Sequence, residues 1–366
     1  MSKRRVGILT GGGDCPGLNA VIRGVTKSAV GKYGMEVVGF YDGFQGMIEE
    51  RFTMLRADDV SGILTHGGTI LGASNKANPF AHPVGSGENR QLADVSDKCM
   101  SLYQDLGLEA LICVGGDGTM TIGGKLAALG ANIVGVPKTI DNDLMETDVT
   151  FGFDSARLAA TEAIDRLHST AQSHHRVMII EVMGRNAGWL ALESGVAGGG
   201  DVILLPELPY DIDEVVSVVR KRSRFGKKFS IVVVSEGARP QGGKQVYREI
   251  ADDTTEPKRL GGISREIGEI LEERSSIECR VTILGHLQRG GTPTPLDRIL
   301  ATQFSVSAME LVAEGKYNHM VALQGNRYVA VPIEKVMGVQ RVVPLDAPLM
   351  KAALAVGTSF GAEIAI

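Results

Sequence analysis

The sequence has few cysteines and no long apolar run, and both scarcities exclude classes of protein. Its four cysteines, Cys15, Cys99, Cys113 and Cys279, form neither a CxxC pair nor a Cys/His metal spacing, so we expect no zinc site and no disulfide framework. No stretch approaches the ~20 apolar residues of a membrane-spanning helix. The apolar run at 6–9 is too short for a secretory signal, and a reducing cytoplasm is the expected compartment.

The sequence also has no excess of positive charge. Lysine and arginine total 38 against 43 acidic residues, which gives a formal net charge of −5. Nucleic acids and anionic membranes attract basic proteins, so we expect neither as a partner. A small anion bound by local cations is the expected ligand.

Apolar segments of strand length alternate with segments of helical spacing. The 366 residues suffice for two domains, and the 47 glycines are dispersed rather than repeated. We expect strands at 6–10, 37–41, 110–114, 133–136, 177–182, 202–205, 229–235 and 280–284, helices at 18–30, 92–106, 120–129, 155–172, 187–196, 212–222 and 261–274, and a loop at 237–259. This alternation predicts an α/β fold of two doubly wound domains with mainly parallel sheets.

One run with a chemical signal, at 115–119, reads Gly-Gly-Asp-Gly-Thr and follows an expected strand. Glycines let backbone N–H groups approach phosphate oxygens. Asp117 either holds a divalent cation there or caps the next helix. Mg²⁺ usually takes one or two carboxylates together with phosphate oxygens, so phosphates favour the metal interpretation.

A second run, at 137–143, reads Pro-Lys-Thr-Ile-Asp-Asn-Asp. If the segment stays extended, Thr139, Asp141 and Asp143 lie on one side. Asp141 could then accept a hydroxyl proton as a general base, kept ionised by a nearby cation. The alternative is a solvated turn with an Asx cap. Together the two runs indicate phosphoryl transfer.

The loop at 11–17 is rich in glycine but has neither the GxGxxG pattern nor the lysine of a P-loop. It is either a tight turn or an anion site at the N-terminus of the next helix. That N-terminus could lower the thiol pKa of Cys15, but without a local histidine a small loop residue is the favoured interpretation.

Four arginines lie at or near the ends of expected strands: Arg176, Arg185, Arg280 and Arg289. Such positions suit phosphate clamps when several arginines converge, whereas for a single arginine a surface salt bridge is the favoured interpretation. His286 and Glu236 are candidates for binding a hydroxyl or phosphate, or have structural roles.

These motifs occur along the chain in the same order as in the bacterial-type 6-phosphofructokinase family, which the sequence resembles. Within that family it resembles a clade in which some members use ATP and others use pyrophosphate as the phosphoryl donor. The matching residues are 12–17, 19–20, 22–25, 67–69, 115–119, 137–143, 181–185 and 285–291, so the resemblance covers nearly the whole chain. NAD kinases and lipid kinases share the run at 115–119 but not the others. A non-catalytic sugar-phosphate sensor is disfavoured, because Asp117 and Asp141 are both present.

The resemblance implies transfer of the γ-phosphoryl group of Mg-ATP to the 1-hydroxyl of fructose 6-phosphate, a step of glycolysis. Asp141 would be the base, Thr139, Lys138 and Arg185 further catalytic residues, and Asp117 the Mg²⁺ ligand. The donor would contact Gly12, Asn75, Lys76, Gly116, Asp117, Gly118 and Thr119. Fructose 6-phosphate would contact Thr139, Asp141, Arg176, Met183, Gly184, Arg185, Glu236, Arg280, His286 and Arg289.

The resemblance also implies a donor domain at 1–150 plus roughly 290–340, and a fructose 6-phosphate domain at 151–289 plus roughly 341–366. Arg176 and Arg280 are similar to arginines that this family contributes across a subunit interface. This implies a homotetramer, or a homodimer, with shared active sites.

Two positions bear on the donor. Pyrophosphate-using relatives have aspartate at position 118 and lysine at 138, whereas typical allosteric ATP enzymes have glycine at 138. This chain combines Gly118 with Lys138. An aspartate at 118 would repel the α-phosphate by about 1–4 kcal/mol at ~4 Å, so Gly118 favours ATP. Lys138 can stabilise the transferring group of either donor, and pyrophosphate stays the alternative.

Other departures concern regulation and the nucleotide. Residues that resemble a nucleotide or phosphoenolpyruvate effector site are Arg23, Lys27, Arg56, Asp201 and Lys227. His168 replaces an arginine expected there, so the resemblance does not establish effector control. Asn75 and Lys76 replace an arginine–aromatic pair that often flanks the nucleotide, so we expect different adenine contacts.

Overall fold

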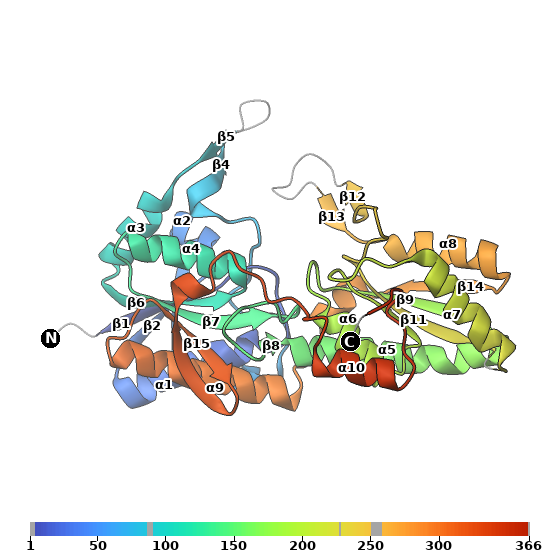
Figure 1. Ribbon diagram of the computed structural model, residues 1–366. Helices are drawn as coiled ribbons and strands as arrows, with labels where there is room; N and C mark the ends of the chain where they lie inside the picture. The colour runs from blue at the N-terminus through green and yellow to red at the C-terminus, as the bar shows by residue number, and fades with distance from the viewer. Residues whose placement is uncertain (1–3, 86–90, 227, 250–257, 365–366) are drawn as a thin grey trace. The chain divides into compact units, whose positions relative to one another are not determined.

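The chain divides into two compact α/β units (Figure 1). The computed structural model describes residues 4–85, 91–226, 228–249 and 258–364. Unit 1 comprises Met1–Thr139, Leu144–Ser155 and Arg289–Gln340, and unit 2 comprises Ile140–Asp143, Ala156–Gln288 and Arg341–Ile366. Among the described helices, none has the length and apolar character needed to cross a membrane.

Within the described residues, unit 1 contains an eight-stranded sheet in the order β16-β15-β7-β6-β1-β2-β3, with β8 paired to β7. The strands are β1 (Arg5–Thr10), β2 (Glu36–Phe40), β3 (Phe52–Leu55), β6 (Leu108–Gly115), β7 (Ile133–Thr139), β8 (Phe151–Gly152), β15 (His319–Gln324) and β16 (Arg327–Pro332). The edge strands β3 and β16 pair antiparallel and the other neighbours pair parallel. The expected mainly parallel sheet is confirmed.

Helices cover both faces of this sheet (Figure 1). One group is α1 (Leu18–Tyr33) with α9 (Pro295–Ala313), and the other is α2 (Phe44–Ile48), α3 (Ser96–Asp105) and α4 (Asp117–Ala128). A Cβ atom on Gly24 of α1 would lie 1.8 Å from the Ser305 hydroxyl of α9, so glycine lets these two helices approach closely. A small hairpin of β4 (His82–Val84) and β5 (Gln91–Ala93) precedes α3.

A fully buried carboxylate stabilises the end of unit 1 from which α5 (Phe153–His174) starts. Asp297 of α9 accepts hydrogen bonds from the backbone N–H of Gly152 at 2.9 Å and of Ser155 at 2.8 Å, and from the Ser155 hydroxyl at 2.6 Å. Burial raises the pKa of Asp297 to about 6, although these hydrogen bonds lower it. The carboxylate thereby joins segments about 140 residues apart in the sequence.

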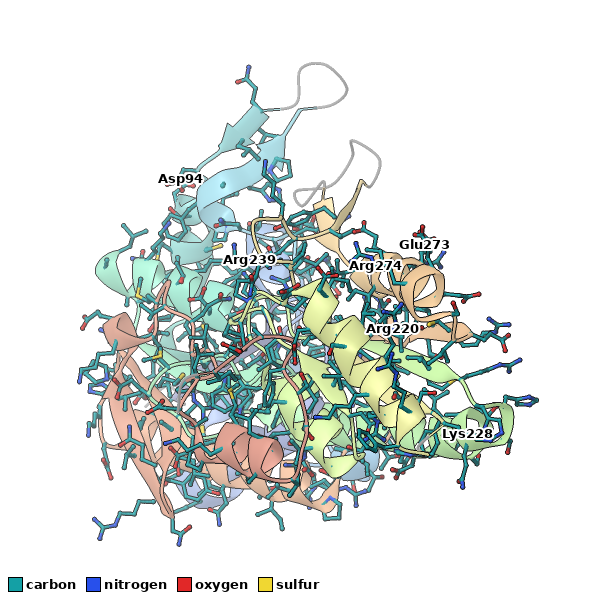
Figure 2. All side chains as sticks on the ribbon, turned by 45° about the vertical axis from the view of Figure 1, so that its right-hand side comes forward. Asp94, Arg220, Lys228, Arg239, Glu273 and Arg274 are labelled. Atoms are coloured by element: carbon teal, nitrogen blue, oxygen red, sulfur yellow. The ribbon has the colours of Figure 1, made fainter. Side chains whose placement is uncertain are left out.

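The described part of unit 2 has a four-stranded parallel sheet in the order β10-β11-β9-β14. Its strands are β9 (Val177–Val182), β10 (Val202–Leu204), β11 (Ser230–Ser235) and β14 (Cys279–Ile283). One apolar core joins the sheet to α5, α6 (Trp189–Ala197) and α10 (Pro348–Ala355), and another joins it to α7 (Ile212–Arg224) and α8 (Ile263–Ser275). Figure 2 shows α7 beside α8, where the Arg220 side chain donates to the Arg274 carbonyl.

Three of the differences between expected and observed elements have a clear structural reason. The helix expected at 92–106 begins at Ser96, because Leu92 pairs in β5. The strand expected at 133–136 continues through Pro137 to Thr139. Strand β15 pairs with Val134 and Gly135 but not with residue 137, so a proline is tolerated there. The loop expected at 237–259 contains the antiparallel pair β12 (Tyr247–Glu249) and β13 (Lys258–Leu260), and residues 250–257 lie outside the described chain.

Candidate active site

The first group of site residues lies in unit 1, where the neighbouring strands β1, β6 and β7 end. We call these residues the glycine cluster: residues 11–13, 115–119 and 138. Parallel strands that are adjacent in a sheet bring the loops after their carboxyl ends together. A Cβ atom on Gly11 would lie 2.5 Å from the Thr119 hydroxyl, and one on Gly115 would lie 2.2 Å from it. Both positions therefore need glycine, because the Thr119 side chain fills the space between the two loops.

Lys138 lies almost fully buried beneath the first glycine loop. Its Nζ donates a hydrogen bond to the Gly13 carbonyl, and a Cβ atom on Gly12 would lie 3.4 Å from Nζ. Gly12, at φ 74°, also donates its N–H to the Ser74 carbonyl at 3.1 Å. The loop thus presents its backbone over a fixed ammonium group, an arrangement suited to phosphate oxygens.

Ser74 is a residue that the sequence analysis missed. The two predicted donor contacts Asn75 and Lys76 follow it directly, and both are exposed. The backbone contact between Ser74 and Gly12 brings this segment to the edge of the glycine cluster. No motif marks Ser74, because its contact is made by the backbone.

Asp117 opens α4, with Gly116 as the N-cap residue and without a side-chain cap. The capping interpretation of Asp117 is therefore wrong. Its Oδ1 accepts a hydrogen bond from the Gly338 N–H at 2.6 Å and one from the Thr121 hydroxyl at 3.3 Å. Both bonds end on Oδ1, so within the described part of the chain Oδ2 is the oxygen that can bind a cation. Gly338 lies 221 residues away and was not expected at the site.

The surroundings of Asp117 fit a Mg²⁺ site in which the protein supplies few of the ligands. Among the described residues, no group of three or more His, Cys, Asp or Glu side chains could hold a metal ion. Mg²⁺ usually binds through one or two carboxylates and takes its other ligands from phosphates and water. A single oriented carboxylate beside glycine loops whose backbone can approach phosphate oxygens satisfies that requirement.

Gly118 differs from its neighbouring glycines. A Cβ atom there would meet no other atom within 4 Å, and the residue is exposed. Neither packing nor a left-handed backbone requires glycine at this position. The absence of a side chain therefore leaves space open next to Asp117.

Arg289 lies against the glycine cluster. Its Nη1 donates to the Asp14 carbonyl at 2.9 Å, and a Cβ atom on Gly13 would lie 2.5 Å from Nη1. The same loop carries Cys15, whose thiol is fully buried. Burial raises the pKa of Cys15 to about 12, so a lowered pKa at this position is wrong and the small-loop-residue interpretation fits.

The second group of site residues lies in unit 2. We call it the carboxylate cluster: residues 140–143 after β7, 183–185 after β9, and 236 after β11. The backbone N–H of Arg185 donates to Glu236 Oε1 at 3.1 Å. Burial raises the pKa of Glu236 to about 7, and the negative charge of Asp141 adds to this rise. The hydrogen bond from the Arg185 N–H lowers the pKa and offsets part of the rise. Glu236, Arg185 and Asp141 thus lie close enough to influence one another.

The segment at 140–143 does not continue the strand. Asn142 has φ 53°, so Thr139, Asp141 and Asp143 do not alternate as in an extended chain, and that expectation is wrong. The solvated-turn interpretation is also wrong, because Asp141 and Asp143 are each only 6% exposed. Asp141 is a buried carboxylate on a tightly bent loop.

Gln288 is a second residue that sequence reasoning missed. It is fully buried, accepts a hydrogen bond from the Met183 N–H at 3.4 Å and donates one to the Gly285 carbonyl at 3.0 Å. Gln288 thereby ties the turn that follows β14 to the loop of Met183 and Gly184. His286, in the same turn, is exposed.

Arg176 and Arg280 are not brought to the carboxylate cluster within unit 2. Both pair with Glu278, Arg176 Nε lying 2.5 Å from Oε2 and the Arg280 guanidinium contacting Oε1. These pairs lower the pKa of Glu278. The salt-bridge alternative describes these two arginines in the isolated chain.

The residues that resemble an effector site are only partly described, since Lys227 lies outside the described chain. Asp201 forms an ion pair with Arg222 at 2.7 Å and accepts the Ile231 N–H at 2.9 Å. His168 Nε2 lies 2.6 Å from the Gly198 carbonyl. Both side chains thus make contacts inside unit 2.

The fold is a parallel α/β fold, and its strand ends carry glycine loops over a buried lysine, an oriented aspartate and a buried carboxylate cluster. These features are typical of enzymes that bind phosphate groups. The family model described as Phosphofructokinase matches residues 5–312, and the chain belongs to that family of kinases. The chain is 51% identical over 360 residues to the ATP-dependent 6-phosphofructokinase 2 of Clostridium perfringens, with 98% of each chain covered. It is 49% identical over 358 residues to the ATP-dependent 6-phosphofructokinase of Spirochaeta thermophila, again with 98% of each covered.

Solved structures show the same fold. Phosphofructokinase from Pichia pastoris in the T-state aligns with a TM-score of 0.78 at 30% identity, over 92% of this chain and 35% of that chain. The present chain thus spans about a third of the Pichia chain. A pyrophosphate-dependent phosphofructokinase from Nitrosospira multiformis aligns with a TM-score of 0.80 at 19% identity, covering 98% and 92% of the two chains, which bears on the fold alone.

Proposed function

We propose that this chain is an ATP-dependent 6-phosphofructokinase, which transfers the γ-phosphoryl group of ATP to the 1-hydroxyl of fructose 6-phosphate in glycolysis. The observation that carries the donor assignment is the open space at Gly118, next to Asp117 and within the glycine cluster. A nucleotide needs room for its α-phosphate there, and an aspartate would fill and repel it. The names of the full-length relatives from Clostridium perfringens and Spirochaeta thermophila support the same donor.

Asp141 is the general base in this proposal. It accepts the proton of the 1-hydroxyl as that oxygen attacks the γ-phosphorus and the bond to the β-phosphate oxygen breaks, which leaves ADP and fructose 1,6-bisphosphate. Thr139, next to this loop, helps to place the hydroxyl. Lys138 and Arg185 stabilise the negative charge that develops on the transferring group.

The donor is held by Gly12, Asn75, Lys76, Gly116, Gly118 and Thr119. Asp117 is the proposed ligand of Mg²⁺, which would neutralise charge on the donor phosphates. In this assignment unit 1 corresponds to the donor domain and unit 2 to the sugar-phosphate domain.

Fructose 6-phosphate is held by Met183, Gly184, Arg185, Glu236, His286 and Arg289. Arg176 and Arg280 complete the site of a neighbouring subunit in a homotetramer or homodimer. The ion pairs of both arginines with Glu278 are consistent with a cluster that rearranges when a phosphate competes for the guanidinium groups. A cytoplasmic location stays a prediction.

Pyrophosphate as donor is the second candidate. The buried Lys138 keeps it open, because that ammonium can stabilise the transferring group of either donor. Separate assays of the purified protein with ATP and with pyrophosphate, each with Mg²⁺ and fructose 6-phosphate, decide between them. We expect fructose 1,6-bisphosphate with ATP. Turnover with pyrophosphate alone would contradict the ATP assignment, and no product with either donor would contradict the function.

A further inference from the structure

The loops of the carboxylate cluster have an unfavourable backbone. Asn142 and Arg185 both lie in the left-handed region, at φ 53° and 49°, and neither is glycine. Residues other than glycine are unfavourable in this region and persist where surrounding contacts hold them. Two hydrogen bonds to the carbonyls of Asn142 and Asp143 come from a distant residue, Arg341.

Arg341 binds the two carbonyls that follow Asp141 in the chain. Its backbone N–H donates to the Asp143 carbonyl at 2.7 Å. Its Nη1 donates to the Asn142 carbonyl at 3.3 Å, across 199 residues of sequence. One residue therefore binds consecutive peptide groups on the carboxyl side of Asp141.

The same arginine is fixed on its other side by Trp189. The guanidinium carbon of Arg341 lies 4.2 Å from the centroid of the Trp189 ring, within the range of a cation–π interaction. Trp189 Nε1 also donates to the Arg341 carbonyl at 3.1 Å. Because Trp189 is the first residue of α6, this contact anchors Arg341 to the end of the loop that carries Arg185.

Glu207 provides a second tie between these segments. Its Oε1 accepts the N–H of Gly188 and the N–H of Val343, both at 2.8 Å. Among the described atoms, its buried Oε2 has no hydrogen-bond partner. A Cβ atom on Gly188 would lie 2.6 Å from Oε2, so the loop is held closely against this carboxylate.

We propose that Arg341, stacked on Trp189, is a positioning residue that fixes the loop of Asp141 relative to the loop of Arg185. This inference rests on the proposed function, in which Asp141 is the base and Arg185 stabilises the transferring group. The Trp189 and Glu207 contacts join the 341–343 segment to the loop of Arg185, and the hydrogen bonds of Arg341 join it to the loop of Asp141. Loss of the Arg341 guanidinium should therefore displace the base. A misplacement of about 1 Å can lower a rate by about 100-fold.

The test compares Arg341→Met with Arg341→Lys in the full chain. Methionine keeps an unbranched side chain but removes the guanidinium, and we expect kcat with ATP and fructose 6-phosphate to fall about 10- to 100-fold. We expect KM for fructose 6-phosphate to stay within about threefold, because the lost interaction acts in the transition state. Lysine keeps the charge without the planar group, so an intermediate kcat is expected.

A spectroscopic measurement tests the stacking without using turnover. Trp189 is the single tryptophan of the chain, so its fluorescence reports on this contact alone. We expect Arg341→Met to shift the emission to longer wavelength, because the ring loses the guanidinium that covers it. This result does not depend on whether the chain phosphorylates fructose 6-phosphate, so failure of the proposed function and failure of this inference are distinguishable.

Val342→Ala is the matched control, since Val342 is the next residue and is 46% exposed. It should leave kcat and the emission unchanged. The proposal is overturned if Arg341→Met has a kcat within about twofold of the unchanged chain, or if kcat per folded molecule is normal and only the melting temperature falls. Should the methionine variant not fold, a normal kcat in Arg341→Lys overturns it equally.

Discussion

The glycine cluster of unit 1 and the carboxylate cluster of unit 2 are built by different forces. In the glycine cluster, close backbone approach sets the geometry: Thr119 fills the space that Gly11 and Gly115 leave, and Lys138 lies under Gly12. In the carboxylate cluster, burial of charge and long-range hydrogen bonds do so, as at Glu236 and Arg341. The first cluster should therefore be sensitive to added atoms, and the second to changes of charge, hydrogen bonding and pH.

Asp141→Ala should have the largest effect, because it removes the proposed base from the carboxylate cluster. A general base contributes about 10²- to 10⁴-fold, so we expect kcat to fall by that factor. Calorimetric titration with fructose 6-phosphate should give a dissociation constant near that of the unchanged chain. Turnover close to normal would contradict the assignment of Asp141 as the base.

Gly118→Asp should have the second-largest effect. This position is the exception within the glycine cluster, because it should be sensitive to charge rather than to added atoms. A repulsion of about 1–4 kcal/mol corresponds to a fall of about 5- to 10³-fold in kcat/KM for ATP. We expect the melting temperature to stay unchanged, since a Cβ atom at this position meets nothing.

Gly118→Ala separates the causes, because it adds the Cβ atom without the charge. It should lose much less kcat/KM for ATP than the aspartate variant. Equal losses in the two variants would show that volume rather than charge excludes the nucleotide, and no loss in Gly118→Asp would contradict the donor assignment.

Glu236→Gln tests the pH sensitivity of the carboxylate cluster. The pKa of Glu236 is raised from 4.5 to about 7 in the folded chain, so its contribution to stability is complete below pH 4.5 and is lost as the pH rises through 7. The difference amounts to about 3 kcal/mol at most. Glutamine does not titrate, so the free energy of unfolding in urea should fall less between pH 5 and pH 8 in the variant than in the unchanged chain. Equal falls in the two proteins would contradict the raised pKa.

Gly115→Ala should have the smallest effect among these predictions, and the effect is on stability. The added Cβ atom would lie 2.2 Å from the Thr119 hydroxyl, and overpacking of this kind costs about 1–3 kcal/mol. Thermal unfolding should show a lower melting temperature. The Thr119 Cβ atom would lie 2.3 Å away as well, so the partner change is Thr119→Gly, which removes the whole side chain. In this double-mutant cycle the double variant should lose less stability than the two single losses summed; additive losses would contradict the steric explanation.

Much of the fold follows from local sequence pattern. The strand–loop–helix order of the first 30 residues and the parallel strands of both units were predicted, and the structure confirms them. The hairpin of β12 and β13 was missed because polar, glycine-rich sequence hides its pairing, and α9 and α10 were not predicted. The extended course of 139–143 was wrong because Asn142 adopts a left-handed conformation that other segments stabilise.

The sequence by itself determined which residues have the chemistry: the glycines that let a backbone approach phosphate, a lysine and aspartates after strands, and the family that these motifs resemble. Only the tertiary structure decided which distant segments orient them. Gly338 holds Asp117, Gln288 holds the Met183 loop, and Arg341 binds the carbonyls after Asp141. The physical reason is that turn and strand preferences act over a few residues, whereas these hydrogen bonds join segments about 100–220 residues apart, which only the order of the strands brings together.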